Sequence, residues 1–175
     1  MRASEVGHVE AVKLLLQNGA DVFARTPRGH TAIHSAAIDG NIGVIEALLD
    51  HNCRVLTATT NGGHTFVHVA LFREKFAVLD HLFGRLNGEN AMVKDLVRRE
   101  DSRGNSALSL AARAGQIGLV KKLMPFASTR QIFSAQREAA GLPTQTRAQM
   151  LDRWQIHHDL FAFLMAIHQE WPLSG

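Results

Sequence analysis

The sequence has one cysteine, Cys53, and no apolar run that approaches the roughly 18 residues needed to span a membrane. A single cysteine excludes an internal disulfide, and the polar start MRASEVGHVE lacks the apolar stretch of a secretory signal. Low-complexity and Pro/Ser-rich stretches are also missing, so we expect one folded unit. These absences predict a soluble intracellular protein, located in the cytoplasm, the nucleus or both.

The chain also lacks a large excess of positive or negative charge. It has 19 Lys and Arg and 16 Asp and Glu, which give a formal net charge of +3 at pH 7. The basic residues are scattered, so they favour acidic partners only weakly and give little support for a nucleic-acid partner. No Gly-x-Ser-x-Gly, phosphate-binding glycine loop or dinucleotide fingerprint is present. Lone acids such as Asp101 are expected at turns and helix surfaces. We therefore predict neither a catalytic group nor a cofactor.

The sequence does contain one motif that recurs along the chain. Gly29, Gly63 and Gly104 open the segments GHTAIHSAAIDGNIGVIEALL, GHTFVHVALFREKFAVLDHLF and GNSALSLAARAGQIGLVKKLM, which are 34 and 41 residues apart. Four sets of apolar residues recur with these repeats, and within each set the residues have the i, i+3, i+6 and i+7 spacing of an amphipathic helix. The sets are Val9, Val12, Leu15 and Leu16; Ile42, Ile45, Leu48 and Leu49; Phe76, Leu79, Leu82 and Phe83; and Ile117, Val120, Leu123 and Met124.

A shorter helix is expected ahead of each apolar stripe, and Gly40 and Gly115 separate the two helices in their units. Glycine takes the left-handed conformation that ends one helix and lets the chain turn back into the next. Glu74 stands at this place in the unit between them, so that hairpin is expected to be looser. The repeat thus predicts a stack of helical hairpins, none of which can bury its stripe alone.

Polar residues at the start of each short helix predict N-caps, at Thr31, Thr65 and Ser106. The residues three positions on are His34, His68 and Ser109, and a side chain in that place can reach back to the cap residue. We therefore expect a structural role for His34 and His68.

Two His-x-x-x-His pairs also raise the question of a metal site. His30 and His64 precede the caps and are expected to be free in the loops, so the two His of a pair do not share a helical face. Cys53 stands close to His51, but it occupies the place of Ala20 in the first unit and is predicted to be a small packed residue. We expect no metal site.

The repeated phrases resemble those of the ankyrin-repeat family. The resemblance rests on GHTAIHSAAIDGNIGVIEALL, GNSALSLAARAGQIGLVKKL and GHVEAVKLLLQNGADV, which are close to the family's Gly-x-Thr-Pro-Leu-His-x-Ala-Ala, Gly turn, Val-x-x-Leu-Leu and Gly-Ala-Asp. It extends from about Arg2 to Phe126. The resemblance implies an all-α solenoid of stacked helical hairpins, and a non-enzymatic protein that binds another protein on its loops and first helices.

Departures from the family phrase suggest two regions. About three full repeats and an N-terminal half repeat are expected in residues 1–127, with an insert at 86–100 that is either an extra contact arm or a longer connector. Because the first copy lacks its Thr-Pro-Leu-His half, we expect the chain to be a fragment of a longer protein or a truncated gene product. Residues 128–175 are expected to form a divergent helical cap, with helices from about Thr129 to Ala140 and from about Thr146 to Glu170. The alternative for the second helix is a partner-binding or membrane-surface role.

The resemblance places the binding surface on thirteen exposed residues. They are Arg25, Arg28, His30, Ile38, Asp39, Asn61, His64, Phe72, Arg73, Ser102, Arg103, Asn105 and Arg113. Five are arginines and one is acidic, which suits a partner with an acidic or phosphorylated segment. Phe72 is either an exposed anchor or packs against the next repeat. The alternative function is the binding of nucleic acid or a phosphorylated small molecule in the same groove.

Overall fold

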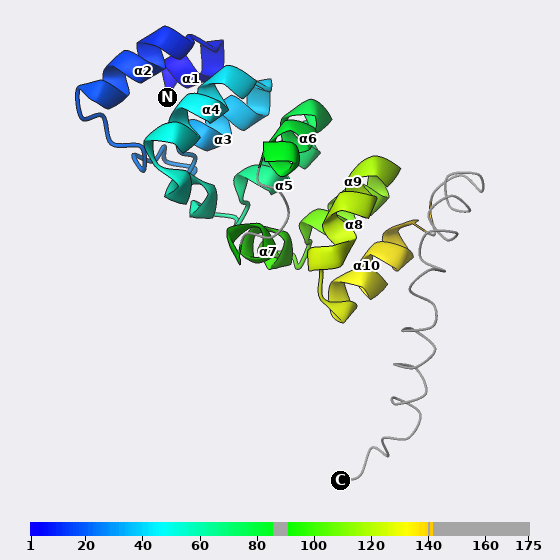
Figure 1. The fold of residues 1–175 in the computed structure, drawn as a ribbon. Helices are drawn as coiled ribbons and strands as arrows, with labels where there is room; N and C mark the ends of the chain where they lie inside the picture. The colour runs from blue at the N-terminus through cyan, green and yellow to red at the C-terminus, as the bar shows by residue number, and fades with distance from the viewer. Residues whose placement is uncertain (86–90, 140, 142–175) are drawn as a thin grey trace, which may run out of the picture.

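The computed structural model describes residues 1–85, 91–139 and 141, and it shows a stack of helices in two rows (Figure 1). The inner row consists of α1 (Arg2–Val6), α3 (Ala32–Asp39), α5 (Phe66–Phe72), α8 (Ala107–Arg113) and α10 (Thr129–Ala139). The outer row consists of α2 (Val9–Gln17), α4 (Ile42–His51), α6 (Phe76–Arg85) and α9 (Ile117–Leu123). Each inner helix contacts the next one in the row. No β-strand occurs among the described residues, and the predicted all-α solenoid is confirmed.

The outer helices bury the apolar stripe that the sequence predicts. Leu48, Leu82 and Leu123 are enclosed in the core, and each lies on a different outer helix. The corresponding residue of the first unit, Leu15, is 50% exposed, whereas Leu48 is 1% exposed. The difference arises because α2 packs against α4 on one side only. Burial of this stripe between neighbouring units is the main stabilising interaction of a helical-repeat fold.

The turn between the helices of each hairpin has a left-handed residue. Gly40 has φ 84° and Gly115 has φ 68°, and Glu74 takes the same region with φ 56°. The residue after the turn also makes the same backbone hydrogen bond in each unit. Lys75 N–H donates to the Ala70 carbonyl at 2.8 Å, as Asn41 N–H does to the Ala36 carbonyl at 2.9 Å. The expected looser hairpin is therefore wrong, because Glu74 adopts the conformation that glycine adopts elsewhere.

Replacing Glu74 by glycine is expected to raise the free energy of unfolding by about 1 kcal/mol, because glycine has no Cβ to strain at positive φ. Denaturant unfolding followed by circular dichroism measures the change. Glu74→Ala is the matched control, since it removes the same side chain and keeps the Cβ. Equal stabilisation by both substitutions would mean that the glutamate side chain, and not the backbone, is the source of the strain.

The insert is part of the core where the structure describes it. Residues 91–98 form α7 (Ala91–Arg98), in which Val93, Leu96 and Val97 are fully buried. Val55 and Leu56 occupy the corresponding places 41 residues earlier, in the short 3-10 helix η1 (Cys53–Thr57), and they are buried too. Residues 91–98 therefore belong to the core, and α7 stands as a longer helix at the repeat position that η1 occupies in the preceding unit. Residues 86–90 lie outside the described part.

The tail begins with the helix that the sequence predicts from Thr129. A 3-10 helix, η2 (Met124–Phe126), precedes it, and α10 then packs along α8 as the next helix of the inner row. Ser128 N–H donates to Gln131 Oε1 at 3.1 Å, and Gln131 Nε2–H donates to the Arg98 carbonyl at 2.8 Å. Gln131 thus links the cap of α10 to the preceding unit. The helix predicted from Thr146 to Glu170, and its capping role, lie outside the described residues.

Candidate binding surface

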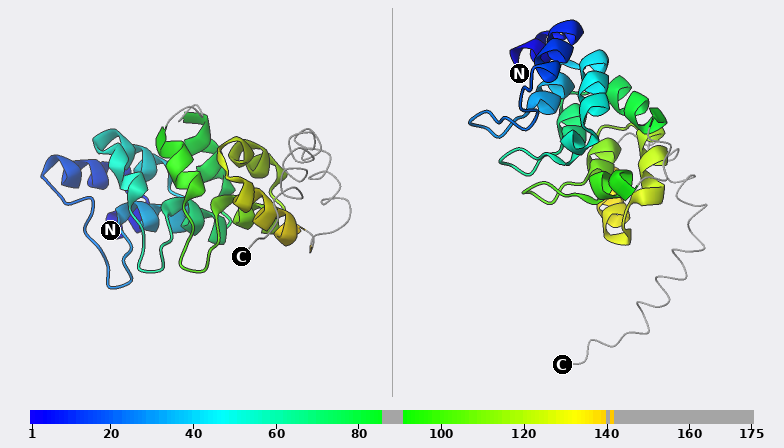
Figure 2. Two further views of the ribbon diagram at one scale, coloured as in Figure 1. Left: turned by 90° about the horizontal axis from the view of Figure 1, so that it is seen from below. Right: turned by 60° about the vertical axis from the view of Figure 1, so that its left-hand side comes forward.

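Three loops project from one edge of the stack, ahead of α3, α5 and α8 (Figure 2). Each loop is closed by a hydrogen bond from the N–H of its first residue to the carbonyl four residues on, at 2.9 Å in all three. The pairs are Thr26 with His30, Thr60 with His64, and Asp101 with Asn105. Isolated antiparallel bridges, Thr59 with Thr65 and Glu100 with Ser106, extend two of the loops. The loops are therefore regular and have the same length.

The loops are also bonded to one another. Asn61 N–H donates to the Arg28 carbonyl at 3.2 Å, and Ser102 N–H donates to the Gly62 carbonyl at 3.0 Å. Two side chains reinforce the first contact: Arg25 donates to the Thr59 carbonyl at 2.8 Å, and Asn61 Nδ2 donates to the Pro27 carbonyl at 2.9 Å. Arg25 and Asn61 are exposed, but their polar groups are engaged in these bonds. The loops consequently form one continuous strip.

The caps beneath the loops have the reciprocal hydrogen bonds of a capping box. At Thr31 and at Thr65 the backbone N–H donates to Nδ1 of the histidine three residues on, at 3.2 and 3.3 Å, and Ser106 pairs with Ser109 in the same way. The other ring nitrogen reaches the next loop: His34 Nε2–H donates to the His64 carbonyl at 3.2 Å, and His68 Nε2–H to the Asn105 carbonyl at 3.0 Å.

Burial keeps these two inner histidines neutral. Desolvation lowers the pKa of His34 to about 4, and it lowers the pKa of His68 as well. In the neutral ring Nδ1 accepts from the cap and Nε2 carries the proton that is donated to the neighbouring unit. Each inner histidine therefore fixes both its own helix start and the loop that follows in the stack.

His64 is not free in its loop, contrary to the sequence-based expectation. Its ring lies 3.2 Å from Thr60 Oγ1 and 3.4 Å from Asp101 Oδ2 in the next loop. Asp101 was expected at a surface turn, but its side chain is buried and accepts from the N–H groups of Arg103 and Asn105. These hydrogen bonds lower the pKa of the Asp101 carboxyl against the opposing effect of burial, which is the largest influence on it. A buried carboxylate therefore joins the two loops.

The residues considered as metal ligands do not form a cluster among the residues that the structure describes. No group of three or more His, Cys, Asp or Glu able to hold a metal ion occurs in the described part of the chain. Cys53 is exposed, so its prediction as a packed residue is wrong. The comparison with Ala20 identified the right place in the repeat, but Ala20 is exposed too. The core position comes two residues later, at Val55.

Four of the five predicted surface arginines have no partner within the described ranges. The side chains of Arg28, Arg73, Arg103 and Arg113 are exposed and have no hydrogen bond or ion pair with any other described residue. On the outer helices, by contrast, three pairs of side chains join neighbouring units. These pairs are Glu46 with His81 at 2.7 Å, Asp50 with Arg85 at 2.5 Å, and Asp80 with Lys122 at 2.5 Å. These four arginines therefore place unpaired positive charge on the loop side.

The other predicted surface residues differ in how far they are available. Asp39 and Ser102 are exposed, Ile38 is half-buried against the core, and Asn105 is half-buried with its amide donating to Asp101 at 2.9 Å. Phe72 is 46% exposed, and its ring meets the His64 ring edge-on at 5.3 Å. Val69 joins Phe72 beside His30 and His64 in a hollow. Sequence reasoning missed Val69, because it belongs to the apolar run of its own helix.

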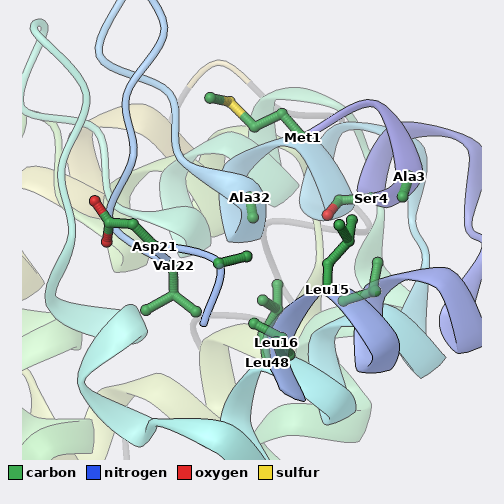
Figure 3. Close-up of a pocket in the computed structure, with 11 residues that line it drawn as sticks. Met1, Ala3, Ser4, Leu15, Leu16, Asp21, Val22, Ala32 and Leu48 are labelled. Atoms are coloured by element: carbon green, nitrogen blue, oxygen red, sulfur yellow. The ribbon is translucent and has the colours of Figure 1, made fainter. Parts of the chain in front are cut away.

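A second cavity lies at the first unit, between α1, α2 and the hairpin of α3 and α4 (Figure 3). It measures about 50 Å³, and Leu15, Leu16 and Leu48 form much of its wall. This volume holds one or two water molecules, since a water occupies about 30 Å³ in the liquid. The cavity is a packing gap beside the half-exposed Leu15.

The sequence pattern of the family described as "Ankyrin repeats (3 copies)" matches residues 1–95. This chain belongs to the ankyrin-repeat family. The match ends within α7, and the hairpin of α8 and α9 continues the same stack beyond it. Ankyrin repeats generally mediate protein–protein interaction, and the family is generally non-enzymatic. No helix in the residues that the structure describes is long and apolar enough to cross a membrane.

Several ankyrin-repeat proteins are similar to this chain over a limited stretch. The E3 ubiquitin-protein ligase XBAT33 of Arabidopsis thaliana is 43% identical over 68 residues, which are 39% of this chain and 13% of the ligase. Protein fem-1 homolog A-like of Mus musculus is 32% identical over 78 residues, 39% of this chain and 12% of that protein. The putative ankyrin repeat protein RF_p14 of Rickettsia felis is 39% identical over 46 residues, 26% of this chain and 73% of that protein. The chain thus spans a small fraction of the first two relatives.

Proposed function

We propose that this chain is a non-catalytic module that binds an acidic or phosphorylated segment of another protein along its loops and inner helices. The observation that carries the proposal is the set of four exposed arginines, Arg28, Arg73, Arg103 and Arg113, which have no partner among the described residues. The proposal concerns the repeats alone. The match to the plant ligase covers repeats, so no ligase activity is proposed for this chain.

Arginine on a rigid support favours recognition of anions. Its planar guanidinium can donate two parallel hydrogen bonds to a carboxylate or a phosphate, and it is weakly hydrated compared with an ammonium group. The hydrogen-bonded strip holds the backbone of Arg28 and Arg103 in place, so little loop entropy is lost when a partner binds. Asp39 is the one acidic residue among the thirteen surface positions. The acids Glu46 and Asp80 pair with His81 and Lys122 on the next outer helix.

A peptide display experiment tests the proposal. Random peptides selected on the unchanged protein are expected to be rich in Asp and Glu. Replacing Arg28, Arg73 and Arg103 together by Glu is expected to weaken their binding about a hundredfold, because attraction becomes repulsion at three contacts. Fluorescence anisotropy measures the dissociation constants.

The matched control carries the same change in charge elsewhere. Arg54, Lys94 and Lys121 are exposed basic residues outside the loops and inner helices, and their triple replacement by Glu is expected to change affinity only weakly through long-range screening. Selection of peptides without acidic residues, or equal losses in both triple variants, would contradict the proposal. Tight oligonucleotide binding with a steep salt dependence would favour the nucleic-acid alternative instead.

A further inference from the structure

A hollow of about 290 Å³ lies on the loop side between α3 and α5. Its apolar wall is formed by Ile38 of α3 and by Val69 and Phe72 of α5. The loop residues His30 and His64 and the exposed Arg73 complete the lining. Apolar atoms form slightly more than half of the lining surface, and the Arg73 guanidinium adds a positive charge at its edge. The hollow therefore combines an apolar floor with a positively charged rim.

The side chains around the hollow are held in place by their neighbours. The Phe72 ring rests edge-on against His64, and His64 is in turn within 3.2 Å of Thr60 Oγ1 and 3.4 Å of the buried Asp101 carboxylate. On the other side the His30 ring stacks on His34, with ring centroids 6.0 Å apart and an interplanar angle of 20°. A preformed hollow of this kind loses little side-chain entropy on binding.

Positive charge converges on the same place. Burial is the largest cause of the lowered pKa of His30, and the charges of Arg28, His64 and Arg73 lower it further. Arg28 and Arg73 come from different units, yet both act on this one ring. A negatively charged ligand beside the hollow therefore meets Arg73 directly and lies in the electrostatic field of Arg28.

We propose that this hollow receives one apolar side chain of an extended acidic segment of a partner protein, while carboxylates next to that side chain pair with Arg73 and Arg28. The proposal rests on the proposed function and adds an anchor to it. The hollow is open to solvent, and its volume of about 290 Å³ is sufficient for one large apolar side chain. Aromatic and aliphatic anchors in central pockets commonly dominate such interfaces.

A library of acidic heptapeptides with one randomised central residue tests the anchor. Selection on the unchanged protein is expected to enrich Leu, Ile, Met and Phe at the centre about tenfold over Ala and Ser, which is the effect of burying such a side chain. Phe72→Ala is expected to abolish this enrichment. Phe23→Ala is the matched control, because Phe23 is exposed to a similar extent, 40%, and does not line the hollow.

A second measurement uses only the unchanged protein, so it does not depend on whether the Phe72→Ala variant folds. In the unchanged protein the methyl resonances of Ile38 and Val69 are expected to shift when a Leu-centred peptide is added, and to shift far less with its Ala-centred twin. Absence of that difference would overturn the anchor.

The two proposals fail in different ways. If the central residue does not matter but the triple Arg-to-Glu variant still loses binding, the anchor is wrong and the proposed function stands. If no acidic peptide binds, both are wrong. Self-association that Phe72→Ala removes, measured by light scattering, would assign the hollow to a second copy of the chain and would overturn the anchor.

Discussion

Replacing Leu96 by alanine is expected to lower the free energy of unfolding by about 3 kcal/mol. Leu96 lies on α7 and its side chain is fully buried, so the substitution leaves a cavity between α7 and the helices that it contacts. Urea unfolding followed by circular dichroism measures the loss. The effect is large for a residue in an insert, because an insert that served only as a connector would contribute little to the core.

Lys94→Ala on the same helix is the control. Lys94 is exposed, so this substitution is expected to change the stability by no more than about 0.5 kcal/mol. A Leu96→Ala variant as stable as the control would show that α7 does not contribute to the core.

Lowering the pH from 7 to 4 is expected to destabilise the protein by about 3 kcal/mol through His34 alone. The pKa of His34 is lowered from 6.5 to about 4 in the folded state, so the unfolded state binds the proton first. The stability that the neutral ring supplies is therefore fully present above pH 6.5, and it is lost as the pH falls toward 4. His68, whose pKa is also lowered by burial, changes the stability in the same direction. Urea unfolding at several pH values measures the slope.

His34→Gln separates this effect from general acid unfolding. Glutamine does not titrate, and Gln131 shows that glutamine completes a cap of the same kind in this fold. The variant is expected to have a shallower pH dependence between pH 6.5 and 4. Asp101 acts in a lower range: its lowered pKa stabilises the protein above about pH 3.8, and that stabilisation is lost on further acidification. Identical slopes for His34→Gln and the unchanged protein would contradict the assignment to His34.

The sequence predicted those features that depend on contacts within one unit. The apolar stripes, the capping residues Thr31 and Thr65, and the glycine turns follow from local geometry and recur at a fixed period, so they can be recognised without a structure. The all-α stack of hairpins follows from the same period. Even the Glu74 turn keeps this geometry, although its residue type argued against it.

Features that depend on two neighbouring units were not predicted. His64 was expected to be free, because its partner Asp101 belongs to the next loop and lies 37 residues away in the sequence. One signal was present: Asp101 stands where the other loops have Thr26 and Thr60, which points to a side chain directed into its own turn. The exposure of Cys53 and the hollow beside Phe72 also depend on how adjacent units are arranged.

The helix α7 has a consequence for how this fold accommodates insertions. The period grows from 34 to 41 residues between the last two loops, yet the segments 26–31, 60–65 and 101–106 are equally long. The extra length lies wholly ahead of the third loop, where α7 takes the place of η1. An insertion within a loop would instead displace the donor of a loop-to-loop hydrogen bond, such as Ser102 N–H to Gly62. In this chain the added length is confined to the connection between an outer helix and the next loop, and the register of the loops is independent of it.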